Sequence, residues 1–526
     1  MKTYYQHLKS TQEFGEKSDI TKKPILRSSA VFPVIKNEYH SSSIHFLGYW
    51  LLKRNIPEVT LIITLRDSNG KILLRKTEVI DVVKAFSIEL SSLLLEINFD
   101  KTNDFLGSIE TEFHSTRDMI FPYPALVLEY HSKSFNTCVH TLGRIYNDFE
   151  DLKQNDALKV PESGFDIHAS DELNSFLSFV NGPLTNNDGI IEYQVINSDS
   201  EKLDGTFHLG EIKPFETKFI EFRKYITKLS DFLKNNSGSI SLKHNFEGFY
   251  PRFLVGTIQS SFPSVSFTHS YYDCTSCKNE TDFWNRVTDT HYDSSIYIPL
   301  FTKDAEYTNL VVYPNFSPSN FFINIELYDK YGKKIHELPK FLHVETNKSE
   351  LHKINFNEII NSLNKDNDIT SANIISDFGS NKIPTRIKFG LDIGMNGLKS
   401  KLPCNICFNS KMGNPLIEKK PGSFHWAPLL PYRNSVIALG NFSTLKNYER
   451  DAEIEITFFR KEDSSSISKK LTLKANCEER ITSNEPDIKE FLKTEGWATI
   501  KANNPYIQGF YFNFNSSGSV AGDHLF

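Results

Sequence analysis

Two Cys-x-x-Cys pairs are the first residues of this 526-residue chain whose type and spacing suggest chemistry: Cys274 with Cys277, and Cys404 with Cys407. Four thiolates from two such pairs can hold a zinc ion tetrahedrally. However, neither pair carries the glycine of a tight metal-binding turn, and residues i and i+3 of a strand point to opposite faces. No βαβ pattern surrounds either pair, which disfavours a thioredoxin-like redox role. We therefore expect the four cysteines to be free thiols, with a zinc site as the alternative.

Histidine also recurs at nearly constant spacing. Three histidines end similar segments, with spacings of 269 − 140 = 129 and 524 − 269 = 255 residues: His140, His269 and His524. Three more stand near the start of the same repeats: His45, His168 and His425. If the first and last strands of a repeat were neighbours, its two histidines would meet. Two imidazoles are an incomplete zinc site, so Asp273 or Asp523 would have to add a carboxylate. We favour the simpler interpretation that duplication copied a hydrogen-bonding residue.

The segment 271–293 combines the densest group of candidate ligands and acid–base groups with aromatic side chains. Aromatic rings beside converging polar groups are typical of small-molecule and sugar sites. We predict a ligand-binding surface there, formed by His269, Tyr271, Asp273, Trp284 and His291. The alternative is that the aromatic residues only join adjacent domains. No residue is predicted to be catalytic.

Known catalytic motifs are missing from the sequence. There is no Gly-x-Ser-x-Gly, His-Glu-x-x-His, Gly-x-x-x-x-Gly-Lys-Ser/Thr or Gly-x-Gly-x-x-Gly. Their absence disfavours an enzyme but does not exclude one, because sandwich enzymes carry catalytic residues on loops. Aromatic clusters around Tyr250, Trp426 and Phe510 could stack on sugar rings, but we expect them to form apolar seams between domains.

A strand–turn–strand motif recurs along the chain, and its strands would position the candidate site residues. "LIITLRDSNGKILLRKTEV" starts at Leu61 and "FINIELYDKYGKKIHELPKF" at Phe322, with weaker copies around Ile191 and Ala452. Apolar residues alternate with polar ones, which is typical of an antiparallel sheet with one buried face. Three copies continue through a short amphipathic stretch to a strand opened by glycine, at spacings of 238 − 107 = 131 and 496 − 238 = 258 residues. Self-similarity near 130 residues indicates duplicated domains.

The repeats predict an all-β chain of four tandem β-sandwich modules, each with one short helical turn. Many short strands with frequent turns favour an Ig-like or fibronectin-like sandwich, with a jelly roll as the alternative. The predicted limits are 1–29 for an N-terminal arm and 30–150, 163–275, 290–412 and 422–526 for the modules. Polar or proline-bearing segments separate them.

Composition narrows the range of partners. The net charge is −6, with 24% charged and 39% hydrophobic residues, and no long basic stripe favours nucleic acid. The first residues lack the apolar core of a secretory signal, and no window approaches the length of a membrane-spanning helix. We expect no transmembrane segment and a cytoplasmic location by default, with export by a specialised route left open.

The function predicted from these observations is a non-catalytic binding or scaffold protein, associated with a glycan or a surface, or with another protein. One alternative is an enzyme that acts on a polysaccharide, with or without a metal, at the junction of modules two and three. A second alternative is a structural subunit of a larger assembly. No cofactor is expected, although zinc stays open, and the sequence leaves the oligomeric state undecided. These expectations rest on analogy between folds.

Overall fold

A computed structural model describes most of the chain, and strands form the bulk of it. The described residues are 24–140, 142–147, 162–234, 236–272, 283–286, 289–314, 317, 319–345, 348–363, 369–384 and 387–526. Strand pairing is antiparallel in each domain, as in the pairs β1–β6, β12–β15, β22–β27 and β32–β37. The predicted all-β, sandwich-type fold is confirmed. Residues 1–23 of the predicted arm lie outside the described part.

Four pairs of sheets in the described residues share one strand order, and we number them as sandwiches one to four along the chain. In sandwich one, the opening sheet has the order β1 (Arg27–Lys36), β6 (Phe105–His114), β3 (Val59–Asp67), β4 (Ile72–Ile80). The closing sheet has the order β5 (Ala85–Glu89), β2 (Ser41–Leu47), β7 (Leu126–His131), β8 (Asn136–His140). The first and last strands thus belong to different sheets.

Sandwich two repeats this order with an interrupted first strand. Its opening sheet has β14 (Lys202–Ile212), β13 (Asn186–Ile196) and β16 (Gly238–His244), which pairs with both β10 (Glu162–Ser163) and β11 (Asp166–Ile167). The short strand β20 (Tyr271–Tyr272) extends it beyond β10. Its closing sheet has the order β15 (Thr217–Glu221), β12 (Leu173–Val180), β18 (Leu254–Gln259), β19 (Val265–His269).

Sandwiches three and four complete the set. The opening sheet of the third has the order β25 (Lys334–Val344), β24 (Phe321–Asp329), β27 (Ile369–Phe378), β22 (Ser294–Pro299), β31 (Lys411–Met412). Its closing sheet has the order β26 (His352–Asn355), β23 (Glu306–Val312), β29 (Lys388–Met395), β30 (Cys404–Asn409). The opening sheet of the fourth has the order β32 (Ser423–Leu429), β37 (Gly496–Ala502), β34 (Ala452–Arg460), β35 (Ser466–Leu473), and its closing sheet has the order β36 (Glu478–Thr482), β33 (Ser435–Asn441), β38 (Ile507–Phe514), β39 (Val520–His524). Two small ribbons pair β9 (Arg144–Ile145) with β17 (Phe249–Tyr250) and β21 (Phe283–Asn285) with β28 (Lys382–Pro384). The predicted module limits stay a prediction.

Short helices follow the fifth strand of each sandwich, where the amphipathic stretches predicted them. They are α3 (Leu90–Glu96), α5 (Phe222–Tyr225) with α6 (Leu229–Leu233), α7 (Phe356–Ser362) and α8 (Pro486–Leu492). A further helix, α2 (Tyr49–Arg54), lies in sandwich one, and 3₁₀ turns lie at Pro415–Lys419 and Pro431–Arg433. The glycine that follows has a packing reason: a Cβ at Gly107 would lie 2.1 Å from the Arg66 carbonyl oxygen. The β6 backbone at Gly107 therefore lies too close to β3 for a side chain.

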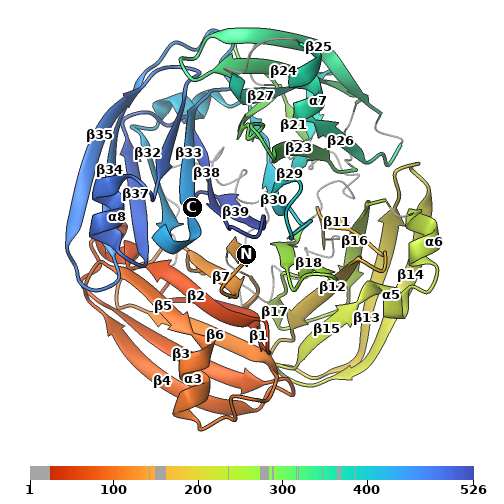
Figure 1. The fold of residues 1–526 in the computed structure, drawn as a ribbon, viewed down its shortest axis with the longest axis vertical. Helices are drawn as coiled ribbons and strands as arrows, with labels where there is room; N and C mark the ends of the chain where they lie inside the picture. The colour runs from red at the N-terminus through yellow and green to blue at the C-terminus, as the bar shows by residue number, and fades with distance from the viewer. Residues whose placement is uncertain are drawn as a thin grey trace.

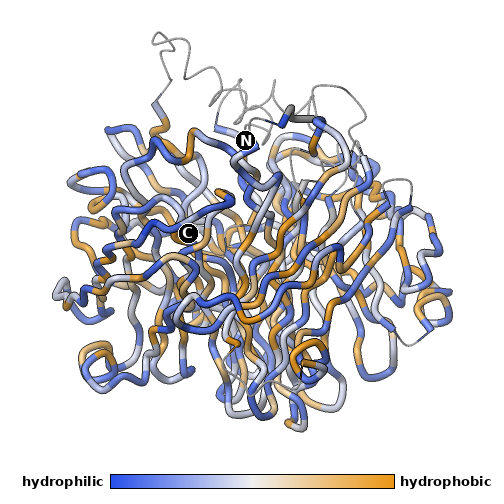
Figure 2. Tube along the Cα trace, turned by 90° about the horizontal axis from the view of Figure 1, so that it is seen from above, coloured by the Kyte–Doolittle hydropathy of each residue, from blue (hydrophilic) through white to orange (hydrophobic). Residues whose placement is uncertain are grey.

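The four sandwiches form a closed ring (Figure 1). They follow one another around a centre, and sandwich four, in blue, lies beside sandwich one, in red and orange. The closing strands β8, β19, β30 and β39 meet at the centre, each in contact with the closing strands of both neighbouring sandwiches. Hydrophobic stretches run through the interior of the ring, while many loops at its rim are hydrophilic (Figure 2).

Alternation along the strands builds the core of each sandwich. In β3, Val59, Leu61 and Leu65 are completely buried, as the period-2 pattern predicts. The outward edge strands differ: most residues of β4, β14 and β35 are exposed or half-buried, and β35 carries Lys469 and Lys470. Charged edge strands resist pairing with other chains. The ring thus buries its inner edges against one another and leaves charged edges outside.

Apolar clusters seal three of the four junctions between sandwiches. One cluster contains core residues of sandwiches one and four together with Phe176, Leu254 and Phe267 of sandwich two. A second joins sandwich three to Phe442 and Phe510 of sandwich four. The third belongs to sandwich two. Among the described residues, no cluster spans the junction between sandwiches two and three.

Candidate ligand site between sandwiches two and three

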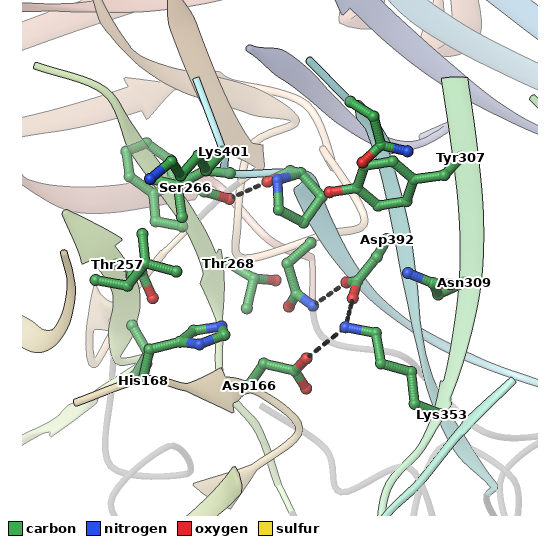
Figure 3. Close-up of a pocket in the computed structure, with 18 of the residues that line it drawn as sticks. Asp166, His168, Thr257, Ser266, Thr268, Tyr307, Asn309, Lys353, Asp392 and Lys401 are labelled. Atoms are coloured by element: carbon green, nitrogen blue, oxygen red, sulfur yellow. Dashed lines mark hydrogen bonds and ion pairs between the residues drawn. The ribbon is translucent and has the colours of Figure 1, made fainter. Parts of the chain in front are cut away.

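A cavity of about 390 Å³, lined by both polar and apolar side chains, occupies the junction that lacks an apolar seal (Figure 3). Sandwich two contributes Asp166, His168, Leu173, Val255, Gly256, Thr257, Ser266, Phe267 and Thr268. Sandwich three contributes Tyr307, Asn309, Lys353, Asn355, Asn357, Asp392, Asn396, Lys401, Leu402, Pro403 and Asn405. The volume falls within the roughly 300–1,000 Å³ that is usual for small-molecule sites.

An interrupted strand accounts for the position of this cavity. The opening strands β1, β22 and β32 have 10, 6 and 7 residues, whereas β10 and β11 have 2 each. At two other junctions the opening strand packs on the closing sheet of the next sandwich: β1 packs on β12 and β22 packs on β33. The shortened strand of sandwich two covers less of sandwich three. Space therefore remains beside β11.

A row of polar residues crosses the closing sheet of sandwich three. Asn309 in β23 is the register partner of Asn355 in β26 and of Asp392 in β29. Asp392 is in turn the partner of Asn405 in β30. Residues in one such row point to the same face of a sheet. Four strands therefore present amide and carboxylate groups side by side, and the Asn405 side-chain amide donates to Asp392 Oδ1 at 2.7 Å.

Sandwich two supplies hydroxyl groups to the opposite wall. Thr257 in β18 is the register partner of Ser266 in β19. The Thr257 hydroxyl lies 2.8 Å from that of Ser175, and the Ser266 hydroxyl donates to the Pro403 carbonyl oxygen at 2.6 Å. This last hydrogen bond crosses the junction. The cavity is thus polar on both sides.

A charged trio links the two sandwiches. Lys353 Nζ lies 2.9 Å from Asp392 Oδ2 and 3.7 Å from Asp166 Oδ2. Figure 3 shows the three side chains pointing toward one another. The two carboxylates are almost completely buried, with side chains 9% and 2% exposed, whereas the Lys353 side chain is 41% exposed. One partly exposed cation therefore serves two buried acids.

These contacts shift the protonation of the site. Burial and the charge of Asp392 raise the pKa of Asp166 to about 7, although Lys353 opposes the shift. The charge of Asp392 raises the pKa of Lys353. Burial and the charge of Lys353 lower the pKa of His168 to about 4. At neutral pH, Asp166 is therefore partly protonated, His168 is neutral and Lys353 is charged.

The residues predicted from sequence as the ligand surface lie against different partners. His269 is buried beside His140, with ring centroids 4.3 Å apart. Tyr271 pairs with Ser163 in β20–β10, and Trp284 pairs with Ile383 in β21–β28. His291 forms a β-bridge with Leu445 of sandwich four, and its Nε2 lies 3.4 Å from Glu418. Asp273 lies outside the described residues, so that prediction stays untested.

The cysteine pairs are half described. Cys404 and Cys407 are buried in β30, while Cys274 and Cys277 lie outside the described residues. Cys404 pairs with Ile393 and Cys407 with Gly390, and the two side chains leave the strand on opposite faces. Burial raises the pKa of the Cys404 thiol, which disfavours the thiolate. The four-cysteine zinc site stays a prediction.

The sequence suggested that the first and last strands of a repeat are neighbours and bring its two histidines together. In sandwich one this is wrong about the strands, because β1 and β8 belong to different sheets. His45 lies in the second strand and contacts Glu129 Oε2 at 3.1 Å. His425 Nδ1 lies 3.0 Å from the Phe526 carbonyl oxygen. The three closing histidines meet one another instead.

The aromatic clusters at module ends form seams. Trp426 is 5% exposed and stacks on Tyr49 of sandwich one at 4.8 Å between ring centroids. Phe510 lies 6.3 Å from Tyr297 of sandwich three. Tyr250 is 1% exposed and packs on Tyr146 at 4.6 Å. These rings are occupied in packing.

Sequence inspection did not single out Asp166, Lys353, Asp392 or Asn309. Each occupies a polar position in or beside a strand, which normally marks a solvent-facing, solubilising residue. The interrupted first strand of sandwich two was the one available signal. "ESGFDIHAS" breaks the alternation with a glycine, and Gly164 adopts a positive φ of 101° there.

No protein-family model matches the chain, and no curated protein matches it. Among the described residues, none of the helices has the length and apolar character needed to cross a bilayer. Functional proposals therefore rest on the geometry of the sites.

Proposed function

We propose that the protein binds a small, hydroxyl-rich ligand of the glycan class in the cavity between sandwiches two and three. The observation that supports this proposal is the polar row Asn355–Asn309–Asp392–Asn405, which faces the hydroxyl-bearing wall of sandwich two. Side-chain amides both donate to and accept from the hydroxyl groups of a sugar, and a carboxylate accepts from them. Tyr307 adds an aromatic ring to the same cavity.

Charge compensation argues against an anionic ligand. Lys353 is held by Asp392, and Lys401 Nζ lies 3.3 Å from Glu172 Oε1. Both lysines of the cavity therefore already have carboxylate partners. A phosphate or carboxylate ligand would have to compete with these pairs, whereas a neutral polyol would not.

Binding can be tested by calorimetric titration of the full chain with a panel of neutral, acidic and amino mono- and oligosaccharides. We expect a neutral member to bind, and Asp392→Ala to weaken it at least about tenfold, since buried hydrogen bonds to charged groups contribute about 1.5–3 kcal/mol. Glu453→Gln, which removes a carboxylate from an exposed position on sandwich four, is the matched control. If the whole panel fails to bind, the glycan proposal falls; if only acidic members bind, the charge argument is wrong.

A second candidate is hydrolysis of such a ligand, because one observation favours it. The pKa of Asp166 is raised to about 7, Asp166 shares Lys353 with Asp392, and a pair of carboxyl groups is the usual catalytic pair of glycosidases. Incubation with any bound oligosaccharide, followed by mass spectrometry, would reveal cleavage. Cleavage that disappears in Asp166→Asn would favour the enzyme; an intact ligand would favour binding alone.

A scaffold role, which the sequence also suggested, is compatible with a ring closed on itself. Such a role needs a partner surface. The cavity is the more specific feature, so the binding proposal is the one to test first.

A further inference from the structure

We propose that His140, His269 and His524 form a binding site for a divalent transition metal of the zinc class at the centre of the ring. The site is separate from the cavity, and its residues come from sandwiches one, two and four. One ring nitrogen from each histidine lies within 4.8 Å of the others. The ring centroids of His140 and His524 are 4.4 Å apart, similar to the His140–His269 distance.

The separation is close to what a metal requires. Zinc binds imidazole nitrogen at about 2.0–2.1 Å, so three tetrahedral ligand nitrogens lie roughly 3.4 Å apart. Small rotations of the side chains would bring nitrogens from 4.8 Å to that separation. His140 and His269 are buried, and the His524 side chain is 29% exposed, which leaves one side of the cluster accessible.

Each imidazole is oriented by an oxygen at its Nδ1 atom. His140 Nδ1 lies 2.8 Å from Asp523 Oδ2, His269 Nδ1 lies 3.0 Å from the Ser270 carbonyl oxygen, and His524 Nδ1 lies 3.0 Å from that of Leu525. Carbonyl and carboxylate oxygens only accept here, so the proton resides on Nδ1 in all three rings. The lone pair is then on Nε2. Metal-binding histidines are typically held in this way by a second layer of acceptors.

Asp523 is itself held in place. Its Oδ2 also accepts the His140 backbone N–H at 2.8 Å, and its Oδ1 accepts that of His524 at 2.8 Å. One buried carboxylate thus holds the His140 ring and the backbone N–H groups of His140 and His524, and it adds negative charge. Arg252, whose Nε donates to the Ser270 carbonyl oxygen at 3.2 Å, adds a positive charge nearby.

The ring explains why the site has three ligands. The closing strand of sandwich three, Cys404–Asn409, contains no histidine. A fourth coordination position would be left for water or another small ligand, as in three-histidine zinc sites. The metal would also join the last strand of the chain to the first two sandwiches, and so would hold the ring closed.

The test uses the full chain, stripped with a chelator and then dialysed against zinc or cobalt(II). We expect about one metal ion per chain by elemental analysis, a visible cobalt spectrum of tetrahedral intensity, and a higher thermal midpoint in the loaded form. His524→Ala should lower the metal content below about a tenth per chain. His131→Ala, whose side chain is 25% exposed and lies 3.9 Å from Glu89, is the matched control and should bind as the parent does.

A second variant guards against misfolding. Asp523→Asn keeps the three histidines and should weaken metal binding about 10–100-fold, as loss of a supporting acceptor does elsewhere. A parent chain that takes up neither metal would overturn the proposal, and so would a folded His524→Ala variant that binds as tightly as the parent. Glycan binding involves none of these residues, so either proposal can fail while the other stands.

Discussion

Lys353 in β26 reaches from sandwich three to within 3.7 Å of Asp166 in sandwich two. This ion pair crosses the one junction that lacks an apolar cluster among the described residues. Since Lys353 also contacts Asp392 at 2.9 Å, a single cation holds two acids of the cavity. An ion pair and hydrogen bonds such as that of Ser266 with the Pro403 carbonyl oxygen thus cross this junction, whereas apolar clusters span the other three.

Lys353→Met should destabilise the protein by about 1–2 kcal/mol. The change leaves two buried carboxylates without their cation, a loss of about 3–5 kcal/mol for a fully buried pair, which the 41% exposure of Lys353 reduces. Urea unfolding measures the effect. Lys470→Met, on a side chain 81% exposed, should change stability by less than about 0.5 kcal/mol. Equal effects of the two substitutions would contradict the role given to Lys353.

Asp166→Asn should change how stability depends on pH. The folded pKa of about 7 lies above the ordinary value of 3.8, so the native state binds more protons than the unfolded chain between these values. The stability of the parent relative to the variant should therefore fall as pH rises from about 4 to 7, by on the order of 2–4 kcal/mol. Urea unfolding of both proteins at about pH 4.5, 6 and 7.5, which covers this range, measures the difference. A constant difference would refute it.

His45→Gln should remove stability that is present only at lower pH. Burial alone would lower the pKa of His45, but the hydrogen bond and charge of Glu129 outweigh it and raise the pKa to about 9. This stabilisation is complete below the unfolded pKa of about 6.5 and is lost as pH rises through about 9. The parent should exceed the variant by about 3 kcal/mol near neutral pH and below, and by little in strongly alkaline buffer. Chemical unfolding across this range decides the matter, and a gap that widens with pH would show the opposite sign.

Trp426→Ala should open the seam between sandwiches four and one. The side chain stacks on Tyr49 and also lies 5.9 Å from Phe526, and replacing a buried Trp by Ala costs about 3–5 kcal/mol. We expect a lower unfolding midpoint and faster proteolysis. Phe341→Ala, at a side chain 41% exposed, serves as the control. An equal fall in the unfolding midpoint of both variants would contradict a stabilising role for the seam.

Local pattern in the sequence was enough to predict the all-β fold and the short helices. Alternation such as Val59, Leu61 and Leu65 states which face of a strand is buried. The amphipathic stretch before β27 predicted α7, which Asn355 caps by accepting from the N–H groups of Asn357 and Glu358. These features depend on near neighbours in the chain, so the sequence alone determines them.

The tertiary structure decided which segment lies opposite each polar face of a strand. Asn309 and Asp392 have the pattern of solvent-facing residues, yet they line a cavity because sandwich two stands opposite them in the ring. His140, His269 and His524 meet across sandwiches because closing strands lie at the inner edges, where the ring brings them together. A period of two specifies the side of a strand, but not its distant partner. That partner is chosen by packing between segments far apart in the chain, which local pattern does not encode.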